Sequence, residues 1–278
     1  MKQDNLGIPK NIITFWHENA SLPPLFAENI KTTLKNNHGC NHLHLDDHDA
    51  LALVEEFFPH LAEFYREMRI PAARSDISRL VALYLYGGVY VDVSMIINEA
   101  IHNHFDPTDQ IFVVRQDTNP IFKNWPHAAN ILNGLIGAEK NSGFILECLK
   151  KSFTNLHFGL QNYSVSIATG PNLITETYLK ICNNYKHTLK NYSELTDRLL
   201  THTRIDGVNN TWVEQQMEGI VNPGFYSTQP LHDVIWAKAC ENSRQNDPTG
   251  SFLQRKFHRP LKRSRKIRLA AIRTSDLV

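Results

Sequence analysis

The chain has 278 residues, of which 42% are hydrophobic, 10% aromatic and 21% charged. This composition excludes disordered, collagen-like and disulfide-stapled chains, and the length predicts one large domain or two small ones. The net charge of +1 hides an asymmetry, because residues 255–278 contain nine Lys or Arg and one acid, which leaves −7 for residues 1–254. A basic tail on an acidic body is typical of a protein that attaches to an anionic partner.

The first part of the chain predicts strands that alternate with helices. Residues 8–16 are β-branched and aromatic with a proline near their start, which predicts a buried strand. After Pro23-Pro24, the apolar spacing of residues 25–35 predicts a helix. Residues 41–45 form a short second strand, and Asp46-Asp47 can cap a helix that continues through Phe58.

The clearest helix covers residues 75–86, begins near Ser75 or Asp76, and ends at Gly87-Gly88. Residues 89–93 follow directly as a strand that ends in an acid. We expect further strands at 111–114 and 134–138 and further helices at 143–152, 173–183 and 234–242. This alternation predicts an α/β fold with a mostly parallel sheet.

Charged side chains of the chemical type that binds phosphates and metals cluster within residues 74–94. Asp76 and Arg79 are three residues apart, so they share one face of the predicted helix near its start, where free backbone N–H groups suit anions. Asp92 lies at the carboxyl end of a strand, where open α/β sheets bind their ligands. A carboxylate there can hold a divalent cation that bridges a diphosphate.

The order of these residues resembles a known family. The pattern S-D-x-x-R-x-x-x-L-x-x-x-G-G-[VIM]-Y-x-D-x-[DTS] is matched by Ser75, Asp76, Arg79, Leu83, Gly87, Gly88, Val89, Tyr90 and Asp92. It is typical of the DXD-containing sugar-transfer family, which includes capsular polysaccharide synthesis proteins, initiating mannosyltransferases and, more distantly, the glucosylating clostridial toxins. The resemblance extends over residues 8–240, through segments 8–16, 43–49, 133–144 and 169–171.

The resemblance implies a GT-A-type, single Rossmann-like domain over residues 1–254, with a nucleotide-sugar half at about 8–100 and an acceptor half at about 101–254. It implies that Trp16 stacks on the nucleotide base, that Asp76 and Arg79 hold the donor sugar and phosphate, and that Asp92 contacts ribose or metal. It further implies donor-pocket positions for Ser75, Tyr90 and Ser94, and a position facing the sugar or the acceptor for Asn133, Thr169, Gly170 and Pro171.

A metal ion, Mn²⁺ or Mg²⁺, is the cofactor that the resemblance implies. The family's usual second acid is Ser94 in this chain, and a neutral hydroxyl is a weaker ligand for these ions than a carboxylate. A histidine near the C-terminus often completes the metal shell in such enzymes. We expect Asp92, Ser94 and His232 to be the ligands here.

No apolar run approaches the roughly 20 residues of a membrane-spanning helix. Four widely spaced cysteines fit a reducing cytosol better than a disulfide framework. The expected location is therefore cytoplasmic. Residues 255–269 interleave basic and apolar side chains, which predicts an amphipathic helix on the anionic cytoplasmic face of the inner membrane, with a solvated terminus as the alternative.

The leading hypothesis is a retaining glycosyltransferase that moves a hexose or N-acetylhexosamine from a nucleotide-diphosphate sugar, with UDP as the expected nucleotide. The expected acceptor is a growing, lipid-linked glycan of the capsule or lipopolysaccharide type. Two alternatives are an effector that glycosylates a protein and a degenerate glycan-binding protein. Nucleic-acid binding is not expected, because such proteins usually spread positive charge over the whole domain, whereas this body is acidic.

Overall fold

The computed structural model describes residues 7–17, 21–116, 130–157, 165–196 and 198–203. Six strands form the central sheet in the order β2-β1-β3-β6-β5-β7. Their bounds are Asn11–Phe15 for β1, Asn41–Leu45 for β2, Gly88–Val91 for β3, Ile111–Arg115 for β5, Ile131–Ala138 for β6 and His187–Asn191 for β7. Only β6 pairs antiparallel with its neighbours. The predicted α/β class with a mostly parallel sheet is confirmed.

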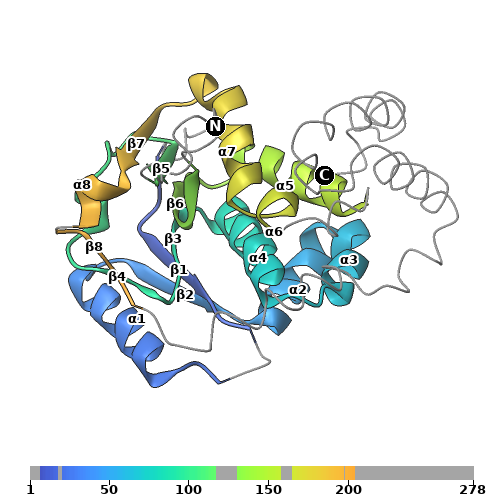
Figure 1. Ribbon diagram of the computed structural model, residues 1–278, viewed down its shortest axis with the longest axis horizontal. Helices are drawn as coiled ribbons and strands as arrows, with labels where there is room; N and C mark the ends of the chain where they lie inside the picture. The colour runs from blue at the N-terminus through green and yellow to red at the C-terminus, as the bar shows by residue number, and fades with distance from the viewer. Residues whose placement is uncertain (1–6, 18–20, 117–129, 158–164, 197, 204–278) are drawn as a thin grey trace, which may run out of the picture.

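Helices cover both faces of this sheet (Figure 1). Their bounds are Pro24–Asn36 for α1, Asp47–Phe57 for α2, Ala62–Glu67 for α3, Pro71–Tyr86 for α4, Gly143–His157 for α5, Val165–Ala168 for α6, Pro171–Ile181 for α7 and Tyr192–Thr196 for α8. A second, two-stranded sheet pairs β4 (Met95–Ile97) antiparallel with β8 (Leu200–His202). Single turns of 3₁₀ helix occur at Pro59–Leu61, Ile101–Asn103 and Cys182–Asn184.

The core is divided into two clusters, one on each face of the sheet. Ile13 and Tyr90 belong to the cluster under α2, α4, α5 and α7. Ile12 and Val89, their neighbours along β1 and β3, belong to the cluster on the α1 and β4 side. This division follows from the alternation of side chains along a strand, which sends successive residues to opposite faces. Both strands are therefore buried on both faces, as expected for parallel strands inside a sheet.

Helix α4 begins earlier than the sequence predicts. It starts at Pro71, which occupies the first helical position, where its missing N–H costs nothing. Ser75 and Asp76 consequently lie in the second turn. The expectation that Asp76 and Arg79 lie at a helix start with free backbone N–H groups is therefore wrong, because by the second turn these groups bond within the helix.

Several elements were not predicted from the sequence. They are the short helices α3, α6 and α8 and the strands β4, β7 and β8. The predicted helix at 234–242, the proposed end of the domain at 254, and the basic tail lie outside the described residues. In the described part of the chain, no helix combines the length and the apolar character needed to cross a bilayer.

Candidate functional site

The turn from α4 into β3 places the candidate residues on two adjacent elements. Gly87 and Gly88 have φ values of 64° and 119°, which side-chain-bearing residues rarely adopt, and a Cβ on either would lie 2.6 Å from a neighbouring backbone atom. The chain therefore passes directly from the helix into the strand. Asp92 follows β3 at its carboxyl end. The parallel register pairs Ile13 of β1 with Tyr90, so Trp16 and Asp92 both lie just beyond the same edge of the sheet.

Arg79 lies between the two acids of the site. Its Nη1 is 3.4 Å from Asp76 Oδ1, and its Nη2 is 3.3 Å from Asp92 Oδ1. Nη1 also donates to the backbone oxygen of Asn133 at 2.7 Å, and Nη2 donates to Ser75 Oγ at 3.0 Å. The guanidinium carbon stands 4.5 Å from the centre of the Tyr90 ring, within cation–π distance. Arg79 is 3% exposed, and its planar, multi-donor group explains how one side chain satisfies so many partners.

Asp76 is enclosed and accepts one hydrogen bond on each of its two carboxylate oxygens. Its Oδ1 accepts from Asn133 Nδ2 and its Oδ2 accepts from Thr169 Oγ1, both at 2.8 Å. The residue is 4% exposed. Burial raises the pKa of Asp76 to about 6, while the charge of Arg79 and the hydrogen bonds from Thr169 and Asn133 act in the opposite direction.

The expected pocket residues Ser75 and Tyr90 contact each other. Ser75 Oγ and the Tyr90 hydroxyl are 3.2 Å apart. Tyr90 is 1% exposed, so its ring packs against the Arg79 guanidinium and offers little surface to a ligand. Burial raises the pKa of the Tyr90 hydroxyl, which is consistent with a neutral phenol in this position.

Two of the residues expected on the sugar or acceptor side, Asn133 and Thr169, contact Asp76. Thr169 is fully buried, and its hydroxyl is bonded to Asp76 rather than facing open space. Gly170 precedes α7, and Pro171 is the first residue of that helix. Asn133, on β6, is partly buried and contacts both Asp76 and Arg79. The structure thus brings Asn133 and Thr169 to Asp76, and the expectation that these positions face the sugar or the acceptor stays a prediction.

Sequence reasoning did not single out Gly134. A Cβ at this position would lie 2.5 Å from Asp92 Oδ2 and 2.6 Å from Met95 Cε. The backbone oxygen of Gly134 also accepts from the N–H of Asp92 at 2.8 Å. The signal was an isolated glycine within a strand pattern, which often marks a close approach of another group to the backbone.

Asp92 and Ser94 are the described members of the expected metal site. The Asp92 side chain is 33% exposed, the most accessible part of the Asp76–Arg79–Asp92 group. The Ser94 backbone oxygen accepts from the N–H and the hydroxyl of Thr203 at 2.8 and 2.9 Å, which fixes the turn after Asp92. A carboxylate and a hydroxyl are oxygen ligands of the kind that Mg²⁺ or Mn²⁺ takes together with several waters. These two residues fit such an ion; His232 lies outside the described residues.

Trp16 extends the site along the same edge of the sheet. Its backbone N–H donates to the backbone oxygen of Leu45 at 3.0 Å, and its ring packs edge-on against Phe26. On another side, the His17 ring is 4.7 Å from it, centre to centre. The residue as a whole is partly buried.

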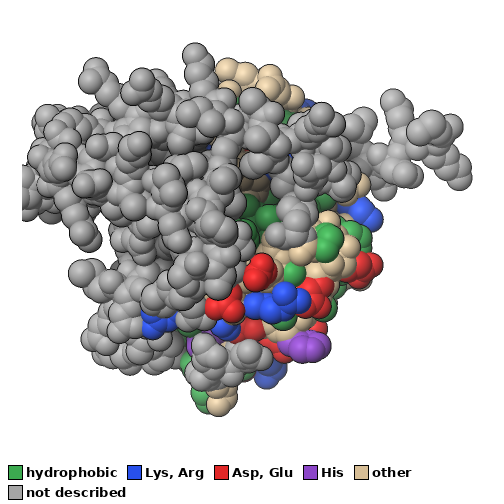
Figure 2. Space-filling model, turned by 90° about the vertical axis from the view of Figure 1, so that its right-hand side faces the viewer, with side chains coloured by type: hydrophobic (Ala, Val, Ile, Leu, Met, Phe, Trp, Pro, Cys, Tyr) green, Lys and Arg blue, Asp and Glu red, His purple; other side chains and the backbone are tan. Residues whose placement is uncertain are grey.

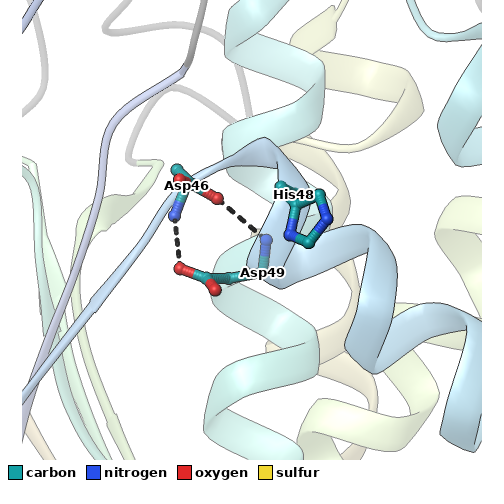
Figure 3. A group of neighbouring side chains, drawn as sticks. All are labelled: Asp46, His48 and Asp49. Atoms are coloured by element: carbon teal, nitrogen blue, oxygen red, sulfur yellow. Dashed lines mark hydrogen bonds between the residues drawn. The ribbon is translucent and has the colours of Figure 1, made fainter.

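A second group of metal-type side chains lies at the end of β2, where Asp46, His48 and Asp49 come together. Asp46 Oδ1 accepts from the Asp49 N–H, and Asp49 Oδ2 accepts from the Asp46 N–H (Figure 3). This reciprocal pair is the capping box of α2, and it accounts for both acids as helix-start residues. It also confirms the predicted capping role of Asp46.

Comparisons with known proteins agree with the sequence resemblance. Residues 23–115 match the family described as the glycosyltransferase sugar-binding region containing a DXD motif. An uncharacterised glycosyltransferase of Acanthamoeba polyphaga mimivirus is 25% identical over 214 residues, which cover 70% of this chain and 82% of the relative. The family resemblance predicted from the sequence is thereby confirmed.

Solved structures with a similar backbone were also found. The PaToxG glycosyltransferase is 20% identical, with 65% of this chain and 71% of that chain covered and a TM-score of 0.47. The UDP-bound glycosyltransferase domain of the YGT toxin is 10% identical, with 84% and 91% covered and a TM-score of 0.44.

Proposed function

We propose that this glycosyltransferase, whose residues 23–115 match the DXD-containing sugar-binding region of its family, transfers a hexose or N-acetylhexosamine from a nucleotide-diphosphate sugar to a growing glycan. A UDP-sugar is the expected donor, and the family resemblance implies retention of the anomeric configuration. The observation that carries this proposal is the contact of Arg79 with both Asp76 and Asp92 at the carboxyl edge of the sheet.

The charges of this group favour particular donor contacts. Two carboxylates and one guanidinium carry a net charge of −1 when Asp76 is ionised. Such a group suits a cation and the hydroxyls of ribose or sugar, which donate hydrogen bonds to carboxylates. Because Arg79 is held by four partners, we assign it the task of orienting the two acids. Asp92 then offers its exposed edge to the donor.

The reaction requires stabilisation of the departing diphosphate. A divalent ion held by Asp92 and Ser94 would neutralise charge that develops on the leaving oxygens. The Trp16 indole provides a stacking surface for the nucleotide base, and Asp76 and Asp92 fix the sugar and ribose. The acceptor hydroxyl can lose its proton to the leaving phosphate, so the chain need not supply a separate base.

We also propose that residues 255–269 attach the enzyme to an anionic membrane, where a lipid-linked acceptor would be found. Each basic residue near an anionic leaflet contributes about 1 kcal/mol to binding. The rest of the chain supports a nucleic-acid function less well. On the face in Figure 2, acidic and basic side chains are interspersed among the described residues instead of forming a positive patch.

A donor screen tests the proposed activity. Purified full chain is incubated with UDP-glucose, UDP-galactose, UDP-N-acetylglucosamine and GDP-mannose, with and without Mn²⁺, and release of the nucleoside diphosphate is followed. We expect release from at least one UDP-sugar. Asp92→Asn should lower the rate of release, by an amount that corresponds to roughly 2–4 kcal/mol of lost transition-state stabilisation, as when a positioned polar contact is removed. Its melting temperature should be unchanged. Equal rates for the variant and the natural chain would contradict this assignment of the site.

A further inference from the structure

The Thr169 hydroxyl has two acceptors within reach, Asp76 Oδ2 at 2.8 Å and the backbone oxygen of Val165 at 3.3 Å, and the contact with the carboxylate is the shorter one. That contact spans 93 residues of sequence, and Thr169 itself is fully buried. Asn133 approaches the other oxygen of Asp76 from β6. The carboxylate therefore receives one hydrogen bond on each oxygen, from two elements that are separate from its own helix.

The backbone around Thr169 holds the residue in a position where its hydroxyl reaches Asp76. The N–H groups of Thr169 and Gly170 both donate to the Val165 oxygen at 2.9 Å, which fixes the turn between α6 and α7. A Cβ at position 170 would lie 3.1 Å from Asp76 Oδ2 and 3.0 Å from the Ser166 Cα. The glycine thus allows the turn to pass close to the carboxylate, and Pro171 begins α7 directly after it.

We propose that Thr169 is a positioning residue, which holds the Asp76 carboxylate in its orientation, instead of a residue that touches sugar or acceptor. This inference rests on the proposed function in so far as Asp76 serves the donor. On this view residues 169–171 do not touch the donor. The Thr169 hydroxyl acts through Asp76, and Gly170 provides the space that the contact needs.

The charge balance around Asp76 gives this role a measurable consequence. Among the described residues, the charged groups that influence Asp76 are Arg79, which favours its ionised form, and Asp92, which opposes it. Burial raises the pKa of Asp76 to about 6, and the Thr169 hydrogen bond lowers it. Removal of the hydroxyl should therefore move the pKa further up, by about one unit for the loss of a hydrogen bond to a charged group.

The first test is the pH dependence of nucleoside diphosphate release. Thr169→Val should move the acid limb of kcat/KM to higher pH by about one unit, while Thr169→Ser, which keeps the hydroxyl, should leave the limb in place. Thr177→Val is the matched control, since Thr177 is also buried but donates to its own helix, to the Leu173 oxygen at 2.9 Å. If Thr169 has a purely structural role, the acid limb of kcat/KM should lie at the same pH in all three variants, and that result would overturn the proposal.

A second test needs no activity. The carboxyl carbons of the full chain are labelled with ¹³C at Asp, and the Asp76 signal, assigned by its loss in Asp76→Asn, is titrated by NMR. The Asp76 midpoint should lie higher in Thr169→Val than in the natural chain and in Thr177→Val. An unchanged midpoint would refute the inference even in an active enzyme, whereas a shifted midpoint in a chain inactive on every donor would refute only the proposed function.

Discussion

Arg79 has four hydrogen-bonding or ionic partners in a space that is closed to water, and its planar group makes this arrangement specific. Lysine has the same charge but a single nitrogen, so it cannot reach Asp76, Asp92, Ser75 and the Asn133 oxygen together. A buried pair that loses one partner also leaves the remaining charges uncompensated, which is costly.

We therefore predict that Arg79→Lys lowers donor turnover nearly as much as Arg79→Ala. The measurement is kcat/KM for nucleoside diphosphate release, with circular dichroism spectra to confirm that both variants are folded. If lysine restores most of the activity, Arg79 acts only as a point charge and its orienting role is refuted.

A second prediction for a single residue concerns Ser94 and the binding of a metal ion. Ser94→Asp supplies the second acid that the family pattern usually contains, two residues after Asp92 in the turn between β3 and β4. A second carboxylate should tighten Mn²⁺ binding, because hard cations prefer charged oxygen ligands. Isothermal titration of the natural chain and the variant with Mn²⁺ measures the difference. Equal, negligible binding in both forms would point to a donor site that does not use metal.

At this scale the sequence was informative about which residues matter and less so about how they act. Asp76, Arg79 and Asp92 were recognisable because their order in the chain is specific. The burial of Thr169 and its bond to Asp76 were not, because that contact joins residues 93 positions apart. Gly134 was overlooked for the same reason: its role depends on how closely Asp92 approaches β6.

At the scale of single elements, the Gly87-Gly88 turn between α4 and β3 determines where Asp92 lies. Gly87 has a φ of 64°, and a Cβ there would lie 2.6 Å from the Lys140 nitrogen and 2.9 Å from the Pro9 ring. Gly39 also has a positive φ, of 91°, but a Cβ there would meet nothing within 4 Å. An alanine at Gly39 would therefore cause backbone strain alone, whereas an alanine at Gly87 would cause both backbone strain and a steric clash.

We predict that Gly87→Ala lowers the free energy of unfolding by about 2 kcal/mol more than Gly39→Ala does, because strain at a positive φ costs about 1–3 kcal/mol and the collision adds to it. Chemical denaturation of both variants gives the comparison. Equal losses at the two sites would mean that the α4–β3 connection adapts easily, and the close packing of this turn would then not be what fixes Asp92.

Elements with local sequence signals were easier to predict than those that depend on contacts with the rest of the fold. Strand β1 and the cap of α2 were predicted closely, because their signals are local: a run of β-branched and aromatic residues, and Asp46-Asp47 ahead of a helix. The start of α4 was placed one turn too late, because buried polar residues at Ser75 and Asp76 resemble a cap. The antiparallel direction of β6 leaves no trace in a pattern of alternating side chains.

At the scale of the whole molecule, the uneven distribution of charge along the chain leads to a prediction about membranes. Full chain and a version ending at Gln254 are co-sedimented with anionic and with neutral vesicles. The full chain should pellet with anionic vesicles, and the binding should weaken as salt screens the charges over about 8 Å or less. The shorter chain should remain in solution. Equal pelleting of the two would refute attachment through the tail.

The position of the bound donor decides which residues form the site, and a crystal structure of the full chain with UDP and Mn²⁺ tests it directly. We predict the uracil ring against Trp16 and the ribose or a metal-bridged diphosphate at the exposed edge of Asp92, with Arg79 still between Asp76 and Asp92. Nucleotide bound away from the carboxyl edge of β1 and β3, or ordered there without contact to Asp92, would contradict the account.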